Sequence, residues 1–207
     1  MNYKFLFPHL FIFVIILLGC KNDDGPNGTN GTPFNSSITS ISGTISNWDK
    51  GNGFRIRLRS WDESNSYITG SASIDSIGHF NMVSLTEPPQ ANVFQVSTAL
   101  QRCSGSVNIS DQSLKISGWY DLWVYAVGGT NPVGMVQFRN DTCWQTYCFS
   151  DRNASMNCHV TCSGDPINMV FSLGKGWNKL SKWITTNQSF ITNEVIQNGD
   201  WIYFDWP

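Results

Sequence analysis

The sequence has little charge and few histidines. Asp, Glu, Lys and Arg make up 14% of its 207 residues, and only three residues are His. The formal net charge is −2 at pH 7, and nothing resembles the basic stripe of a nucleic-acid-binding protein. We therefore expect no nucleic-acid partner.

Motifs for catalysis and cofactor binding are also missing. The chain has no G-x-S-x-G, no H-E-x-x-H and no glycine-rich phosphate loop, the patterns typical of hydrolases, zinc proteases and nucleotide-binding proteins. Without C-x-x-C-H, covalent haem is not indicated, and we expect no cofactor and no metal. Paired-carboxylate hydrolysis needs two acids that lie close together in space. The candidates are Asp62, Glu63 and Asp121, and the sequence does not show which of them converge. An unrecognised hydrolase remains an alternative.

A sustained helical period is absent, whereas short strand patterns are frequent. Phe54, Ile56 and Leu58 alternate with three arginines, which predicts a strand with one buried face. The stretches 67–74 and 79–85 predict a hairpin around a turn at 75–78. About nine or ten such strands with turn signals between them favour an all-β fold. We predict an antiparallel β-sandwich, either one large or two small packed ones.

Three stretches need separate predictions. The segment 114–127 is apolar on both faces, which predicts a central strand covered on both sides, with 135–139 as its hairpin partner. The segment 92–100 fits either a strand or a short helix. The segment 140–166 is expected to form short strands and loops.

One long apolar run exists, Leu10 to Leu18 near the N-terminus. It is too short for a membrane-spanning helix, which needs about 20 residues, and it suits the apolar core of a secretory signal. Its end, Leu17-Leu18-Gly19-Cys20, resembles the lipobox of bacterial lipoproteins. That resemblance implies a diacylglyceryl group on Cys20, and two or more acyl chains anchor a protein stably to a membrane. We expect a signal peptide at 1–19 and a lipidated Cys20 with a flexible tether at 20–37.

The residues after Cys20 indicate on which side of the outer membrane the protein lies. Lys21-Asn22-Asp23-Asp24 resembles the surface-export signal of Bacteroidetes lipoproteins. The expected localisation is therefore the outer membrane, facing either the cell surface or the periplasm.

Two further resemblances concern the fold. Ser42 to Trp48, followed by Ser73 to Met82, resembles the transthyretin-like or carboxypeptidase-regulatory-like β-sandwich, which implies such a sandwich at 38–105 and further strands of the same or a second sandwich at 106–207. Cys103-Ser104-Gly105, Leu122 to Tyr125 and Gly174 to Asn178 resemble uncharacterised bacterial surface lipoproteins. That group implies a fold but no activity.

Five cysteines remain if Cys20 is lipidated, and disulfides are the default outside the cytoplasm. We expect two bridges within the cluster formed by Cys143, Cys148, Cys158 and Cys162, although Cys103 could pair into it. The spacings in that cluster also allow a structural zinc site with His159 as a spare ligand, which an oxidising compartment disfavours.

Aromatic residues suggest a ligand platform. Trp119, Trp123 and Tyr125 share one face of a predicted strand, and Trp201 and Tyr203 share a face of the last one. Flat rings of this kind present a large contact area to a sugar, although the same rows would equally fill a sandwich core.

A row of arginines is the second candidate site. Arg55, Arg57 and Arg59 fit either a site for an anionic partner or a charged strand protected from aggregation. The sequence thus predicts a membrane-anchored structural or interaction module, with glycan binding or adhesion as an alternative and a glycan or protein as the possible partner.

Overall fold

The computed structural model describes residues 37–60 and 67–206. The predicted signal peptide, Cys20 and the tether to residue 36 lie outside the described residues. Strands account for 60% of the structure and helices for 6%, so the predicted all-β fold is confirmed. Across residues 37–60 and 67–206, no helix is long and apolar enough to cross a membrane.

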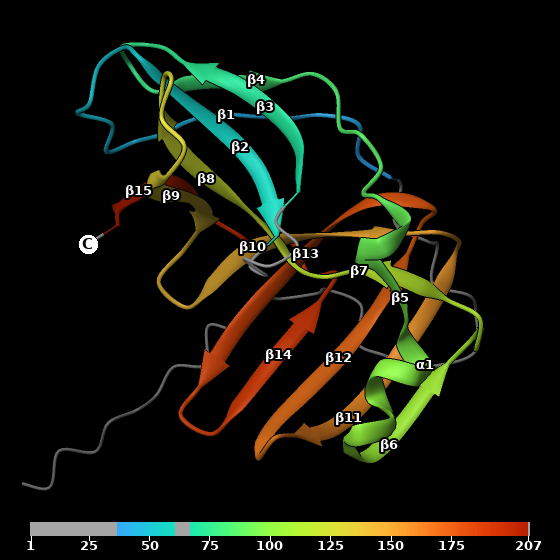
Figure 1. Cartoon of the computed structure of the whole chain (residues 1–207). Helices are drawn as coiled ribbons and strands as arrows, with labels where there is room; N and C mark the ends of the chain where they lie inside the picture. The colour runs from blue at the N-terminus through green and yellow to red at the C-terminus, as the bar shows by residue number, and fades with distance from the viewer. Residues whose placement is uncertain (1–36, 61–66, 207) are drawn as a thin grey trace, which may run out of the picture.

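The described residues form one open sheet of fifteen strands (Figure 1). Most neighbours are antiparallel, whereas β12 and β14 pair in parallel. The main path of the sheet runs, in spatial order, through β1 (Ile41–Thr44), β4 (His79–Met82), β3 (Ile68–Ile74), β2 (Phe54–Ser60), β8 (Tyr120–Ala126), β9 (Pro132–Arg139), β10 (Cys143–Ser150), β13 (Gly176–Thr185), β14 (Gln188–Thr192), β12 (Asp165–Leu173), β11 (Ala154–Cys162) and β6 (Ser104–Ile109). Off this path, β15 (Asp200–Asp205) pairs with β9, and β5 (Val93–Gln95) pairs with β7 (Lys115–Ser117), which in turn pairs with β10.

The sheet buries two separate hydrophobic cores. The first core lies among β1–β4, β8, β9 and β15, and the second core lies among β6, β7, β11, β12 and β14. Figure 1 shows these groups at opposite ends of the molecule with β10 and β13 between them. The first core contains strands from both sides of residue 105, which is the boundary between the two β-regions expected from the sequence.

Strand β10 contributes to both cores because successive side chains of a strand point to opposite faces. Tyr147 and Phe149 enter the first core, and Cys148 enters the second. On β13, Trp177 enters the first core and Leu180 enters the second. The two cores therefore lie on opposite faces of one sheet, and the buried face changes at these two strands.

Residues 140–166 differ from the expectation of short strands and loops. They form two long strands, β10 and β11, joined by a short turn. Along β11, Met156, Cys158 and Val160 are buried and alternate with polar residues. That prediction was wrong because a cluster of cysteines does not by itself indicate loops held by disulfides, and a buried cysteine thiol behaves as a small hydrophobic group.

Other local predictions are confirmed. The arginine strand is β2, and the hairpin at 75–78 joins β3 to β4 with Gly78 at a φ of 86°. Strand β8 is buried on both faces and forms the predicted hairpin with β9. The ambiguous stretch 92–100 holds both expected structures, since β5 is followed directly by the short helix α1 (Val96–Ala99).

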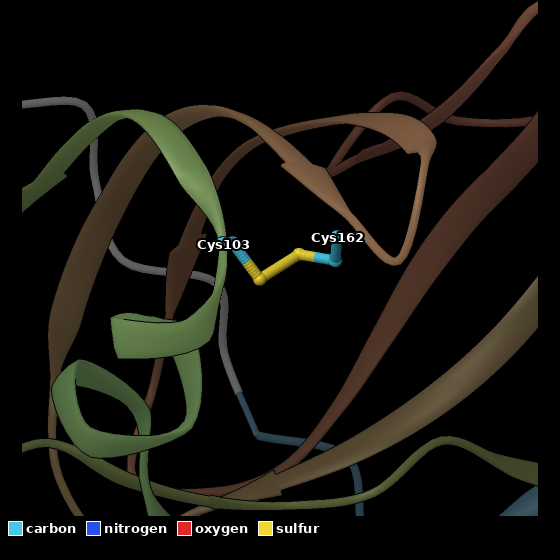
Figure 2. The surroundings of a disulfide bond; sticks show 2 residues. All are labelled: Cys103 and Cys162. Carbon is cyan, nitrogen blue, oxygen red and sulfur yellow. A yellow bond between two sulfur atoms is a disulfide. The ribbon is translucent and has the colours of Figure 1, made fainter.

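A single disulfide joins Cys103 to Cys162 among the described residues (Figure 2). It fastens the segment between α1 and β6 to the end of β11. The expectation of two bridges within 143–162 was wrong, because Cys143 and Cys148 lie on opposite faces of β10 and because β10 and β11 are not neighbours in the sheet.

The other thiols are buried in the strands. Cys148 and Cys158 both lie in the second core. Burial raises the pKa of Cys148 to about 12 and also raises the pKa of Cys158, so both side chains stay protonated and chemically quiet at neutral pH.

Candidate functional site

The aromatic row on β8 is covered by the arginine row on β2. The two strands pair so that Arg57 lies opposite Trp123 and Arg55 opposite Tyr125. The Arg57 guanidinium lies 4.3 Å from the centre of the Tyr125 ring, and that of Arg59 lies 5.5 Å from the centre of the Trp123 ring. Trp123 and Tyr125 keep only 5% and 2% of their surface exposed. They offer a ligand almost no surface, and Arg57 and Arg59 lie over them. Arg55 is exposed and donates to the Ser71 hydroxyl at 3.3 Å.

The aromatic pair on β15 lies in or against the first core. Tyr203 is buried, and its hydroxyl donates to the backbone oxygen of Val133 at 3.1 Å. Trp201 is half-buried between Phe80 and Phe138. Its indole lies so close to Gly43 that any side chain at that position would collide with it. These contacts fit the core interpretation of the pair.

Trp119, the fifth platform residue, lies in a different setting. It is half-buried and lines a pocket of about 830 Å³. The pocket walls come from Ser60 at the end of β2, from β5, from the start of β8, from the end of β9 and from β10 and β13. The lining residues are Ser60, Phe94, Gly118, Trp119, Asp121, Met135, Gln137, Arg139, Trp144, Thr146 and Lys182.

The pocket arises where β10 crosses the end of the β8–β9 hairpin. Strand β10 pairs with the beginning of β8 at Tyr120 and with the end of β9 at Arg139. The Thr146 hydroxyl donates to the backbone oxygen of Tyr120 at 3.1 Å and fixes this crossing. The hollow lies on the sheet face that carries Trp123, where the Arg57 and Arg59 side chains lie over the β8 rings.

The lining of the pocket is chemically mixed. Indole rings come from Trp119 and Trp144, and an exposed phenyl ring comes from Phe94. Asp121 is buried, with 5% of its surface exposed, and is the one acid among the described lining residues. Apolar walls with a few placed polar groups are typical of a site for a small polar ligand.

Two cations lie beside the Trp144 indole. In the sheet register Arg139, Trp144 and Lys182 are direct neighbours on β9, β10 and β13. The Lys182 ammonium lies 5.7 Å from the centre of the Trp144 ring. The Arg139 guanidinium lies 5.4 Å from the centre of the Phe204 ring.

The acid in the pocket also acts on its surroundings. Burial first, and then the charge of Asp121, raise the pKa of the Tyr147 hydroxyl well above its usual value. Tyr147 therefore stays neutral and donates to Oε1 of Gln145 at 3.0 Å. It belongs to the first core and takes no part in the pocket chemistry.

Neither histidine of the folded part enters the pocket. His79 is exposed in the β3–β4 hairpin, with its Nδ1 3.2 Å from a carboxylate oxygen of Asp75. His159 is exposed on β11 and contacts the side-chain oxygen of Asn168. Within residues 37–60 and 67–206, no three His, Cys, Asp or Glu residues are grouped so that they could hold a metal ion.

Sequence reasoning identified Trp119 and missed Trp144, Arg139 and Lys182. These three residues come from three strands, and only the pairing of β9, β10 and β13 makes them neighbours. The sequence holds one local signal for Lys182, because a charged residue there interrupts a stretch that contains Leu180 and Trp183.

Comparisons of the chain with protein-family models, with curated proteins and with solved structures find no match. The resemblances described for the sequence therefore stay predictions, and the function has to be argued from the pocket itself.

Proposed function

We propose that this chain is an envelope lipoprotein, anchored through Cys20, whose folded part binds a carbohydrate in the pocket. The anchor is supported by the apolar run and by the lipobox-like end of residues 1–20. The binding function is supported by one observation above all. Two half-buried indoles, those of Trp119 and Trp144, line the same hollow together with hydrogen-bonding groups.

A sugar ring matches this lining because it has apolar C–H faces and a rim of hydroxyl groups. Indole and phenyl rings contact the apolar faces with little loss of side-chain entropy. Gln137 offers a polar group at the same site. The volume of about 830 Å³ falls within the range of pockets that enclose small ligands, about 300–1,000 Å³.

The pocket gives less support to the hydrolase alternative. Glycoside hydrolysis by the common mechanism uses two carboxyl groups about 5–10 Å apart. Asp121 is the one acid among the described lining residues. Asp62 and Glu63, the other candidate acids of this alternative, lie outside the described residues.

The test of the binding function uses the full-length protein, purified in a mild detergent and applied to a glycan array. We expect binding to one group of glycans, followed by calorimetric titration with the best of them. Trp119→Ala and Trp144→Ala should each weaken that binding at least tenfold, because each removes an apolar wall.

Trp183→Ala is the matched control. Trp183 is also half-buried, but it lies on the opposite face of the sheet, where its ring stacks on Phe190 at 5.0 Å. Its replacement should leave the affinity unchanged. Absence of binding to every glycan, or an equal loss in all three variants, would contradict the proposal.

The anchor is tested separately by expression in a bacterium and mass spectrometry of the mature protein. We expect a chain that begins at an acylated Cys20, and a Cys20→Ala variant that lacks the lipid. An unmodified Cys20 in membrane-bound protein would refute the anchor without affecting the pocket.

A further inference from the structure

Two cations and one acid, Asp121, are the charged groups among the described lining residues of the pocket. Arg139 and Lys182 are both half-buried at its wall. Among the described residues neither forms an ion pair, although Arg152 is paired with Asp111 and Asp151, and Lys50 with Asp205. Asp200 lies opposite Arg139 in the sheet register, yet it makes no ion pair with it.

The two side chains are placed to act on one ligand. They flank Trp144 on neighbouring strands, and strands in a sheet are about 4.8 Å apart, so their backbones are separated by roughly 10 Å. Both side chains rise from the same face of the sheet. Both line the same pocket. The Arg139 guanidinium lies over Phe204 of β15, on the edge of β9 away from β10, so it has to turn from that ring to meet the same group as Lys182.

Each cation is held in place by neutral partners. The Nε–H of Arg139 donates to the backbone oxygen of Asn140 at 3.1 Å, and its guanidinium lies over Phe204. The Lys182 ammonium lies over the Trp144 ring. The terminal N–H groups of Arg139 and the ammonium of Lys182 are thus positioned, and the two cations outnumber the one acid among the described lining residues.

The surrounding face adds to this positive charge. The β2 arginines lie on the same face as the pocket, with Arg59 directly opposite Asp121 in the register of β2 and β8. Positive charge is in excess over the single acid Asp121 on this face, and a concave site with an excess of one charge concentrates ligands of the other sign. The net charge of the whole chain is −2, so this basic face is a local feature.

We infer that the carbohydrate bound in this pocket carries an acidic group, a carboxylate or a sulfate, that is held between Arg139 and Lys182. The inference rests on the binding function proposed above and narrows its ligand class. Partly buried cations gain most from an anion that also supplies hydrogen-bond acceptors. Trp119 and Phe94 then contact the sugar ring that carries this group.

The experiment titrates the full-length protein with matched sugars. Uronic acid oligomers are compared with their methyl esters, and sulfated oligosaccharides with their unsulfated forms. We expect the acidic member of the recognised pair to bind at least tenfold more tightly, and the pair that shows the difference distinguishes carboxylate from sulfate. The preference should shrink as the salt concentration rises.

Two charge-matched variants locate the effect. Lys182→Met should weaken binding of the acidic sugar at least fivefold more than binding of its neutral partner. Lys175→Met removes the same charge from an exposed loop and should change neither affinity. Equal binding of acidic and neutral sugars, unaffected by Lys182→Met, would overturn this inference and leave the binding function standing. Failure of every sugar to bind would overturn both.

Discussion

One face of the sheet carries aromatic side chains on both sides of β9, but their burial differs between the two sides. Over β8, the Arg57 and Arg59 side chains of the neighbouring strand close over Tyr125 and Trp123, and the aromatic rings become interior. Over β10 the Lys182 ammonium lies 5.7 Å from the centre of the Trp144 ring, yet Trp119 and Trp144 remain half-buried and line an open pocket. The same residue type on the same face is therefore structural in one half and available to a ligand in the other.

The cause of this difference is the geometry of the strands. Strand β2 runs beside β8 in register along its whole length, so its arginines lie directly opposite the β8 aromatics. Strand β10 instead crosses the end of the hairpin and pairs with β8 and β9 at one residue each. A regular ladder brings covering side chains into contact, whereas a crossing leaves space between them.

The largest expected effect compares a covered and an open tryptophan. Trp123→Ala should lower the free energy of unfolding by about 3–5 kcal/mol, because it empties a fully enclosed site. Trp144→Ala should cost no more than about 1.5 kcal/mol, because its indole is already partly in water. Urea unfolding followed by far-ultraviolet circular dichroism measures both losses. Equal losses would show that the two halves of the face do not differ in packing.

A second prediction concerns the disulfide near the open half. The Cys103–Cys162 bridge spans 59 residues of sequence and fastens the segment that follows β5, whose Phe94 forms a pocket wall. Replacing both cysteines by serine should lower the stability by about 2–4 kcal/mol, because the unfolded chain gains freedom. Dithiothreitol should reduce the stability of the parent protein to that of the variant in urea unfolding. It should leave the variant unchanged, and a parent protein that is insensitive to reductant would contradict the prediction.

The smallest expected effect depends on pH. Arg152 contacts the carboxylates of Asp111 at 3.3 Å and Asp151 at 2.9 Å, and Asp151 accepts a hydrogen bond from the Lys115 N–H of β7. Strand β7 carries β5 and therefore the Phe94 wall. This group of charges thus holds the β5–β7 side of the pocket in place. The covered half of the face is instead held by the continuous pairing of β2 with β8.

Both carboxyl groups have depressed pKa values. Hydrogen bonds from Ser113, and then from Arg152, lower the pKa of Asp111. Burial acts to raise the pKa of Asp151, but hydrogen bonds from Arg152 and Lys115 lower it overall. Groups whose pKa is lower in the folded state stabilise it above their ordinary pKa, and this stability is lost as the pH falls through the folded-state pKa.

The corresponding variant is Arg152→Met, measured by thermal unfolding from pH 7 to about pH 2.5. Its melting temperature should lie below that of the parent protein at pH 7, and the gap should shrink as the carboxylates become protonated. Arg102→Met, which removes an exposed arginine from a short helical turn, should show no such pH dependence. A gap that stays constant with pH would mean that Arg152 stabilises through packing alone.

Local patterns in the sequence predicted much of the secondary structure. The alternation of Phe54, Ile56 and Leu58 with arginines was sufficient for β2, because a half-buried strand needs only a period of two. The turn at 75–78 was predictable because Asp75 accepts hydrogen bonds from the N–H groups of Ile77 and His79, a contact within five residues. The apolar residues on both faces of β8 correctly indicated a strand covered on both sides.

The pocket and the disulfide could not be predicted from such local patterns. The bridge joins residues 59 positions apart, and the pocket combines residues from several strands. Whether an aromatic row is interior or exposed depends on which strand lies next to it, and no period within the row contains that information. For this reason the β8 aromatics and Trp119 appeared equivalent in sequence, although only Trp119 reaches the pocket.

The sequence by itself determined that this protein is an all-β chain with a half-buried arginine strand and a central apolar strand, because these properties depend on side-chain alternation within a few residues. The tertiary structure alone decided that the arginines cover Trp123 and Tyr125, that the buried face changes at β10, and that Arg139, Trp144 and Lys182 meet around one pocket. These outcomes depend on strand pairing and register between distant segments, which bring together side chains that no local pattern relates.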